Sequence, residues 1–314
     1  MVRPMEADPT LESLNALAGD LDGLGLLEGV RREHPVGPLT TYRVGGTAAL
    51  FVRPRDAEEL AAVASVAGPA GQPFLGLGRG SNLLVSDDGF AGLAVQLGFG
   101  FETIEIDGTD VVVGGAASLP VVARRTVAAG LTGFEWAVGV PGSMGGAARM
   151  NAGGHGADLA AVLVSASVVN LSDGSTTECP AVELGLGYRT SALLHDEVVV
   201  AARLALAAGD VEVGEERLAE VVRWRRENQP GGQNAGSVFT NPEGDSAGRR
   251  VDTAGCRGLR CGTAVVSDRH ANFIQADENG SAEDVVALMD EVARRVLEVH
   301  GIALVPETVL IGFG

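Results

Sequence analysis

The segment GVPGSMGGAARMNAGGHG, residues 139–156, is dense in glycine and lies in a β-rich part of the chain. Because glycine has no Cβ, such a segment lets the main chain approach a flat ligand closely. Ser143, Asn151 and backbone amides can bond ring or phosphate oxygens, while Met144 and Met150 offer soft apolar surface. We therefore expect a ligand-binding loop here.

A second glycine loop, GLGRGSN at residues 76–82, precedes it in the chain. A Rossmann fingerprint needs GxGxxG between a strand and a helix, but here the spacing is GxGxG and a strand-like LLV follows. Successive backbone N–H groups can instead form an anion-binding nest, with Ser81 and Asn82 as further donors. A purely structural glycine turn is the alternative. Together the two loops indicate one long ligand with a phosphate end and a flat end, and a flavin dinucleotide meets both conditions.

Composition limits the fold and the function. The 314 residues, 46 % of them hydrophobic, predict a folded protein of two or three domains. The net charge of −18 argues against general nucleic-acid binding, which needs a basic face. The chain has no lysine and all 23 basic residues are arginine. This excludes a Walker phosphate loop, a Schiff-base enzyme and a protein kinase.

The sequence shows no pattern typical of a membrane helix, a signal peptide or a metal site. No apolar run reaches the roughly 18 residues of a membrane helix, and residues 1–10 show no signal-peptide pattern. The spacing of the three cysteines shows no paired pattern, and the histidines lack the spacing of metal ligands. We expect a cytoplasmic protein with reduced thiols and no metal.

The order of elements predicts an α+β fold, because strands cluster in hairpins rather than alternating with helices. Residues 1–35 are interpreted as a loose lead-in, and the chain after about residue 210 as a smaller α/β domain. The expected elements are strands at 40–54, 74–85, 197–207 and 264–276, hairpins at 104–115 and 162–179, helices at 56–68, 118–130, 213–228 and 281–301, and a loop entering a short strand at 233–242.

Several segments together resemble the UDP-N-acetylenolpyruvoylglucosamine reductase family. They follow the family's order over almost everything after residue 35, and together they are highly specific. The matching segments are TTYRVGG (40–46), GRGSNLLV (78–85), GVPGSMGGAARMNAG (139–153), YRTS (188–191), QNAGSVFTNP (233–242), SDRHANFI (267–274) and VPETVLIG (305–312).

The resemblance implies two FAD-binding subdomains of the vanillyl-alcohol-oxidase (PCMH/VAO) type and a C-terminal α/β substrate-binding domain. The implied divisions are a lead-in (1–35), the flavin subdomains (36–98 and 99–210), the substrate domain (211–303) and a segment returning to the active site (304–314). It also implies that NADPH reduces bound FAD. The enolpyruvyl sugar nucleotide then takes hydride on its methylene carbon and a proton on the neighbouring carbon, which yields UDP-N-acetylmuramate for peptidoglycan synthesis.

Site residues are transferred from the family motifs position by position. Ser237 matches the proton donor, Arg189 the arginine beside the enolpyruvyl carboxylate, and Glu307 the catalytic glutamate. Residues matched to substrate binding are Tyr188, Arg225 and Asn241, with Arg226 equally available in place of Arg225. Residues matched to FAD binding are Tyr42, Arg43, Gly78, Arg79, Gly80, Ser81, Asn82, Gly139, Pro141, Gly142, Ser143, Gly145, Gly146, Asn151 and Gly153.

The sequence departs from the family pattern at two positions and leaves other functions open. Thr240 and Val309 stand where many relatives carry a lysine and some an arginine, so two cations near the anionic substrate are missing. The stretch after Arg189 is short, which is typical of the subclass that lacks a Tyr-bearing loop. A flavin-dependent sugar or alcohol oxidase and a non-catalytic flavin or nucleotide-sugar sensor are the alternatives, and a monomer is expected.

Overall fold

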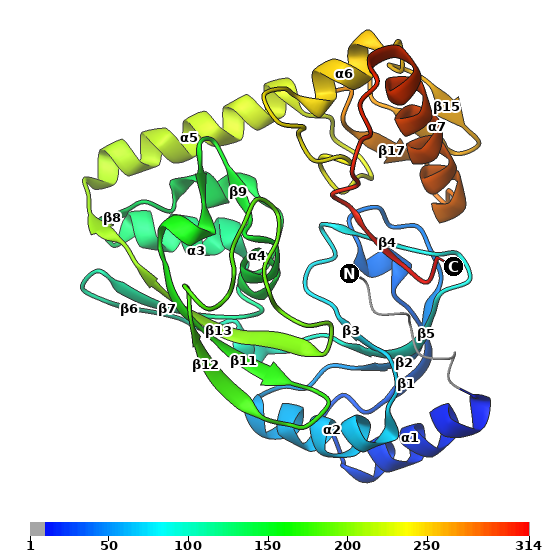
Figure 1. Ribbon diagram of the computed structural model, residues 1–314. Coiled ribbons are helices and arrows are strands. Elements are labelled where there is room, and N and C mark those ends of the chain that lie inside the picture. The colour runs from blue at the N-terminus through cyan, green and yellow to red at the C-terminus, as the bar shows by residue number, and fades with distance from the viewer. Residues whose placement is uncertain (1–9, 314) are drawn as a thin grey trace. The chain divides into compact units, whose positions relative to one another are not determined.

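The computed structural model describes residues 10–313 and divides into two compact units, each built from separate stretches of the chain (Figure 1). The first unit comprises the described residues up to His34, then Ala48–Arg79 and Ala91–Arg223. The second unit comprises Pro35–Thr47, Gly80–Phe90 and the chain from Trp224 onward. The sequence-based division had placed residues 36–47 and 80–90 in the first flavin subdomain, so the observed grouping differs there. The signal-peptide prediction concerns residues 1–10, nearly all outside the described residues.

The first part of the first unit is a four-stranded sheet flanked by two helices. Its strands follow the order β1-β2-β5-β3, and β3 pairs with β5 in parallel. Helices α1 and α2 pack together beside this sheet (Figure 1). Asp56 caps α2 by accepting from the N–H of Glu59 at 3.1 Å, as expected. The elements are α1 (Leu11–Gly23), β1 (Arg31–Pro35), β2 (Thr47–Val52), α2 (Ala57–Ala70), β3 (Phe74–Gly76) and β5 (Phe90–Val95).

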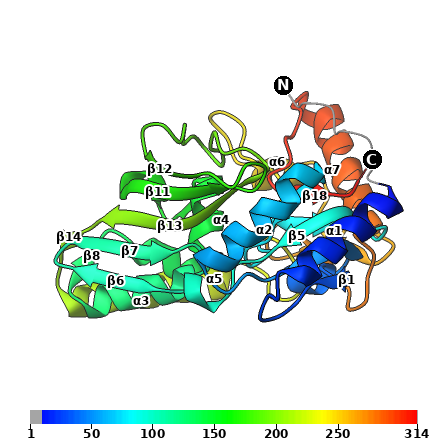
Figure 2. The same cartoon turned by 90° about the horizontal axis from the view of Figure 1, so that it is seen from below.

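The second part of the first unit is a five-stranded antiparallel sheet in the order β12-β11-β13-β7-β6. Both predicted Asp-Gly hairpins are confirmed, and α3 lies along the β6–β7 side (Figure 2). The elements are β6 (Ile104–Asp107), β7 (Asp110–Gly114), α3 (Leu119–Ala128), β8 (Leu131–Thr132), α4 (Met144–Met150), β9 (Gly153–Gly154), β10 (Ala157–Asp158), β11 (Leu163–Asn170), β12 (Thr176–Pro180), β13 (Glu197–Ala205), β14 (Ala207–Ala208) and α5 (Val211–Asn228), whose residues from Trp224 onward belong to the second unit.

The second unit contains a three-stranded sheet, β15-β16-β17, packed against α7. The predicted buried stripe of α7 is confirmed by Val285, Leu288, Met289, Val292 and Val296. Strand β4, which follows the first glycine loop, pairs in parallel with the C-terminal strand β18. The elements are β4 (Leu83–Val85), α6 (Ala247–Thr253), β15 (Arg260–Cys261), β16 (Ala264–Val266), β17 (Ile274–Ala276), α7 (Ala282–His300) and β18 (Val309–Ile311).

The lead-in prediction is wrong, because residues 10–35 are structured. Thr10 caps α1 by accepting from the N–H of Ser13 at 3.2 Å. Leu17 and Leu21, four residues apart on one face of the helix, are buried in the core that α1 shares with α2.

Three other local predictions also change. Residues 40–46 form no strand, because Arg43 and Gly45 both adopt positive φ, 56° and 103°. Residues 144–150 form the helix α4, capped by Ser143 through the N–H of Gly146, and Met144 is buried in the core rather than on a surface. The strand expected within 233–242 is reduced to two isolated bridges, one between Gln233 and Ala276 and one between Phe239 and Pro306.

The stripe of α7 gives a matched test of core packing. Leu288 is fully buried, whereas Leu297 on the same helix is 51 % exposed. We expect Leu288→Ala to lower the free energy of unfolding by about 2–5 kcal/mol, because it leaves a cavity. Leu297→Ala changes it by about 0.5 kcal/mol or less. Urea denaturation followed by circular dichroism measures both, and equal losses would contradict this packing.

Candidate functional site

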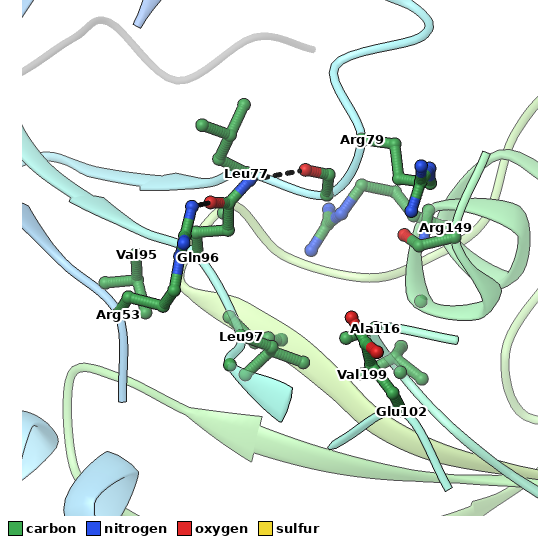
Figure 3. A pocket seen from close by; sticks show the side chains of 18 of the residues that line it. Arg53, Leu77, Arg79, Val95, Gln96, Leu97, Glu102, Ala116, Arg149 and Val199 are labelled. Atoms are coloured by element: carbon green, nitrogen blue, oxygen red, sulfur yellow. Dashed lines mark hydrogen bonds between the residues drawn. The ribbon is translucent and has the colours of Figure 1, made fainter. Parts of the chain in front are cut away.

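A cavity of about 360 Å³ lies in the first unit (Figure 3) and falls within the usual size range of ligand pockets. Its wall is formed by the ends of β3, β5, β7 and β13 and by α4. Of the residues expected to bind FAD, it is lined by Gly78, Arg79, Ser143, Gly145 and Gly146. Glu28, from the supposed lead-in, also contributes.

Glycine lets three backbone segments meet at the wall of this cavity. A Cβ on Gly115 would lie 2.1 Å from the carbonyl oxygen of Val199, and one on Gly145 would lie 2.8 Å from that same atom. The N–H of Gly145 donates to the carbonyl of Gly115 at 2.8 Å. A Cβ on Gly78 would meet the Ser143 hydroxyl at 2.7 Å. The first turn of α4 therefore contacts β7 and β13 through main chain alone.

A polar relay anchors the first glycine loop to β2 and β5. Gln96 donates from Nε2 to the carbonyl of Gly78 at 3.0 Å and accepts from the guanidinium of Arg53 (Figure 3, dashed lines). Glu28 lies 3.9 Å from Arg53 across the same wall. The sequence analysis missed Gln96, which comes from an ordinary strand end without a glycine or motif signal.

The residues of the cavity fit a flavin dinucleotide. Bare main chain at Gly78, Gly115 and Gly145 allows close approach of a flat ring or a phosphate. The guanidinium groups of Arg53 and Arg79, which also line the cavity, are of the kind that would hold a diphosphate. Apolar walls come from Leu77, Val95, Leu97, Phe99, Val198 and Val199.

Other residues expected to bind FAD lie elsewhere. Gly139, Pro141, Gly142, Asn151 and Gly153 belong to the first unit but not to the lining of this cavity. Asn151 is buried, and its amide donates to Asp158 and to the Gly187 carbonyl and accepts from the N–H of Ala160. Tyr42, Arg43, Gly80, Ser81 and Asn82 belong to the second unit. Burial of Tyr42 there raises the pKa of its hydroxyl.

Arg189 lies in a short loop of the first unit that bends sharply. Its backbone is left-handed, with φ of 59°, and a bridge joins Gly187 to Thr190. Its guanidinium donates to the carbonyl of Gly153 at 3.0 Å and lies 5.1 Å from the ring centre of Tyr188. The predicted arginine and tyrosine therefore form a cation–π pair, and the tyrosine side chain is 57 % exposed.

Ser237 and Glu307 come together in the second unit, although 70 residues separate them in the sequence (307 − 237). The N–H of Glu307 donates at 2.7 Å to the carbonyl of Val238, the residue after Ser237. Asn82 holds the same segment, because its amide donates to the carbonyl of Glu307 at 2.9 Å and its own carbonyl accepts from Val309. The side chain of Asn82, expected on the cofactor, thus fixes the Glu307 segment.

Asn272 is a buried amide that holds the serine segment. Its Oδ1 accepts from the N–H of Phe239 at 3.1 Å, and its Nδ2 donates to the carbonyl of Phe239 at 2.8 Å. Its own carbonyl accepts from Val238 at 2.9 Å. The sequence analysis quoted Asn272 inside SDRHANFI but gave it no role. An amide that stands between the apolar residues Ala271 and Phe273 is the signal that could have found it.

The substrate candidates differ in their surroundings. Arg225 is half-buried, and burial lowers the pKa of its guanidinium, whereas Arg226 is exposed. Within residues 10–313 no carboxylate forms an ion pair with Arg225. Asn241 accepts from the N–H of Ala247 at 3.0 Å, at the start of α6. At the two positions lacking family cations, Thr240 bonds the Val305 carbonyl and Val309 is in β18.

The glycine contacts predict which substitution disturbs flavin binding. In Gly145→Ala the new methyl group meets two backbone carbonyls, so α4 has to move away from β13. We expect the Kd for FAD to rise at least about tenfold, or about 1.4 kcal/mol. Gly154→Ala is the control, since a Cβ there meets nothing within 4 Å. Flavin fluorescence during titration measures both, and unchanged affinity in Gly145→Ala would contradict the cavity assignment.

Comparisons with known proteins agree with this arrangement. A model of the UDP-N-acetylenolpyruvoylglucosamine reductase C-terminal domain matches residues 228–311, and a model of an FAD binding domain matches residues 48–180. The reductase of Acidiphilium cryptum is 42 % identical over 88 % of this chain and 90 % of its own length. The reductase of Rubrobacter xylanophilus is 38 % identical over 91 % and 97 %.

A solved structure is similar over the same range. The crystal structure of UDP-N-acetylenolpyruvylglucosamine reductase from Thermus caldophilus has a TM-score of 0.79 and 36 % identity, and the match covers 90 % of this chain and 99 % of that one. Among the described residues no helix is long and apolar enough to cross a bilayer, and no cluster of metal-ligating side chains is found. The fold, the glycine-lined cavity and these matches show that the chain belongs to the UDP-N-acetylenolpyruvoylglucosamine reductase family.

Proposed function

We propose that this chain reduces the enolpyruvyl group of UDP-N-acetylglucosamine enolpyruvate to UDP-N-acetylmuramate, using NADPH and bound FAD. The observation that carries the proposal is the family match over nine-tenths of the chain, together with a glycine-lined cavity whose residues fit the flavin. The reaction places the protein in peptidoglycan precursor synthesis, and hence in cell-wall biogenesis, cell shape and division. We propose that it acts in the cytoplasm as a monomer.

FAD is held by the cavity of the first unit in this proposal. Gly78, Gly145 and Gly146 give main-chain contact, Arg79 faces the diphosphate, and Ser143 adds a hydroxyl. Bound FAD supplies the hydride chemistry, which no amino-acid side chain provides. Gln96 keeps the first glycine loop in place by donating to the Gly78 carbonyl, and Arg53 holds Gln96 by donating to its side-chain oxygen.

Three side chains act on the substrate in this proposal. Ser237 donates the proton from Oγ to the carbon next to the one that receives hydride. A hydroxyl is a weak acid, but the enolate that it meets is strongly basic. Arg189 grips the enolpyruvyl carboxylate with two N–H groups and stabilises the charge that develops on it. Glu307 helps to stabilise or polarise the intermediate; a carboxyl group stabilises negative charge when it is protonated and donates a hydrogen bond.

Recognition of the nucleotide sugar falls to Tyr188, Asn241 and Arg225. Arg225 is favoured over Arg226, because its guanidinium is half-buried whereas that of Arg226 is exposed, and no ion pair within the described part of the chain occupies it. A guanidinium without a counter-ion is suited to a diphosphate. No lysine is available for this task anywhere in the sequence.

A spectroscopic experiment tests the proposed activity. The purified protein is expected to be yellow and to release FAD on heating. Under argon, NADPH bleaches the flavin band and the enolpyruvyl sugar nucleotide restores it. Restoration by air at a catalytic rate, with no response to the sugar nucleotide, would indicate an oxidase and overturn the proposal. Absence of bleaching would leave the sensor as the better account.

Ser237→Ala separates the two half-reactions. Only the second half needs the proton, so we expect reduction by NADPH to change by less than about twofold and reoxidation by substrate to slow about 10²–10⁴-fold. Ser65→Ala, at an exposed serine of α2, is the control and leaves both rates unchanged. Stopped-flow absorbance measures each half. Equal slowing of both halves by Ser237→Ala would argue against a proton-donor role.

Arg189→Lys tests the two-pronged grip. An ammonium group keeps the charge but cannot reproduce two parallel N–H bonds to a carboxylate. We expect reoxidation by substrate to slow about tenfold or more, as expected when about 1.4 kcal/mol of transition-state binding is lost, with FAD affinity unchanged. A lysine variant as fast as the original protein would show that charge alone suffices at this position.

A further inference from the structure

Arg149 fastens the loop that carries Arg189 to the last turn of α4. Its Nη1 donates to the carbonyl of Leu193 at 3.4 Å, and its Nη2 donates to the carbonyl of Leu194 at 3.0 Å. The same Nη2 also donates to the carbonyl of Glu197. One guanidinium therefore bonds three carbonyls of the segment 193–197, which begins four residues after Arg189.

The partners of Arg149 make this contact a demanding one. The guanidinium is largely desolvated, and this burial lowers its pKa, while the charges of Glu197 and Asp196 act in the opposite direction. Arginine nevertheless stays charged at neutral pH, so its donors need acceptors inside the protein. The carboxylate of Glu197 accepts from the N–H of Leu194 at 2.6 Å and closes the turn that presents the carbonyls.

Further hydrogen bonds attach the loop on both sides of Arg189. The hydroxyl of Ser191 donates to the carbonyl of Arg149 at 2.7 Å. The amide of Asn151 donates to the carbonyl of Gly187 at 3.0 Å, and Arg189 itself donates to the carbonyl of Gly153 at 3.0 Å. Residues 149–153 thus form one anchoring segment for residues 187–197.

The backbone of Arg189 explains why such anchoring is needed. A residue with a Cβ at φ of 59° lies in a sparsely populated, unfavourable region of backbone conformation. It persists only where the surroundings hold it. A loop freed from its anchor would relax, and the guanidinium of Arg189 would lose its fixed direction.

We propose that Arg149 is a positioning residue for substrate reduction: by gathering the carbonyls of residues 193–197 it keeps Arg189 in the strained conformation that grips the enolpyruvyl carboxylate. This inference rests on the proposed role of Arg189. Arg149 also lines the flavin cavity, so a direct role in FAD binding is the competing account that the experiment separates.

A double-mutant cycle tests the proposal. Arg149→Met, Arg189→Ala and the double variant are compared in two assays: the Kd for FAD, and reoxidation of the NADPH-reduced enzyme by the enolpyruvyl sugar nucleotide. Arg125→Met, at an exposed arginine of α3, is the control. If the two residues act as one unit, Arg149→Met slows reoxidation about tenfold or more by itself but less than about twofold when Arg189 is already alanine. The Kd for FAD changes less than about twofold in Arg149→Met.

Amide hydrogen exchange gives a readout that does not depend on turnover. Arg149→Met is expected to speed exchange at residues 187–197 while the strands β11 and β13 keep their protection. Arg149→Lys is the milder variant, because one ammonium cannot bond all three carbonyls. It should give a smaller change in the same direction. If Arg149→Met does not fold, Arg149→Lys and Ser191→Ala enter the cycle in its place.

The outcomes are distinct. Equal slowing by Arg149→Met with either arginine or alanine at position 189 would overturn the inference, as would a tenfold rise in the Kd for FAD with normal reoxidation. Unchanged exchange at 187–197 would also overturn it. If Arg189→Ala alone leaves reoxidation intact, the proposed role of Arg189 fails first, and the anchoring by Arg149 has no catalytic meaning.

Discussion

The glycine-lined cavity, which is the proposed flavin site, depends on close backbone contact at Gly115 and Gly145. The carbonyl of Val199 occupies the space that a side chain would need at either position. Because of this, α4 begins directly against β7 and β13, and Gly78 can lie against Ser143. The cavity wall is therefore main chain on one side, with side chains such as Arg53, Gln96 and Leu97 on the others (Figure 3).

The second unit has to hold Ser237 and Glu307, the two proposed reactive residues, which are distant in sequence. Two asparagine side chains do this instead of glycine: Asn272, which is buried, and Asn82, which is half-buried. Asn272 pairs with both backbone groups of Phe239, and Asn82 with the segment on either side of Thr308. An amide supplies a donor and an acceptor together, so it can replace a missing strand partner at the end of a short ladder. Such amides are costly to bury unpaired and therefore fix one arrangement.

Local patterns predicted the local structure well. The Asp-Gly hairpins and α7 were confirmed because their turns, caps and apolar periodicity lie within a few residues of one another. The helix α1 was missed, since only Leu17, Ala18 and Leu21 are buried and Gly19, a poor helix former, stands among them. Grouping of residues 35–47 and 80–90 with the C-terminal part could not be predicted, because it depends on long-range pairs such as β4 with β18. Asn151 was predicted to bind a ligand because its side chain can donate and accept hydrogen bonds. In the structure it ends α4 in a left-handed conformation, and its amide bonds to protein groups instead.

The central claim is that the hydroxyl of Ser237 protonates the substrate while hydride arrives from the flavin held in the glycine-lined cavity. A crystal structure of the protein with FAD and the enolpyruvyl sugar nucleotide tests it most directly. The account predicts the isoalloxazine against Gly115 and Gly145, and Ser237 Oγ about 3–3.5 Å from the carbon that takes the proton. An ordered complex with that oxygen well beyond reach of this carbon, or with the ring bound outside the cavity, would contradict it.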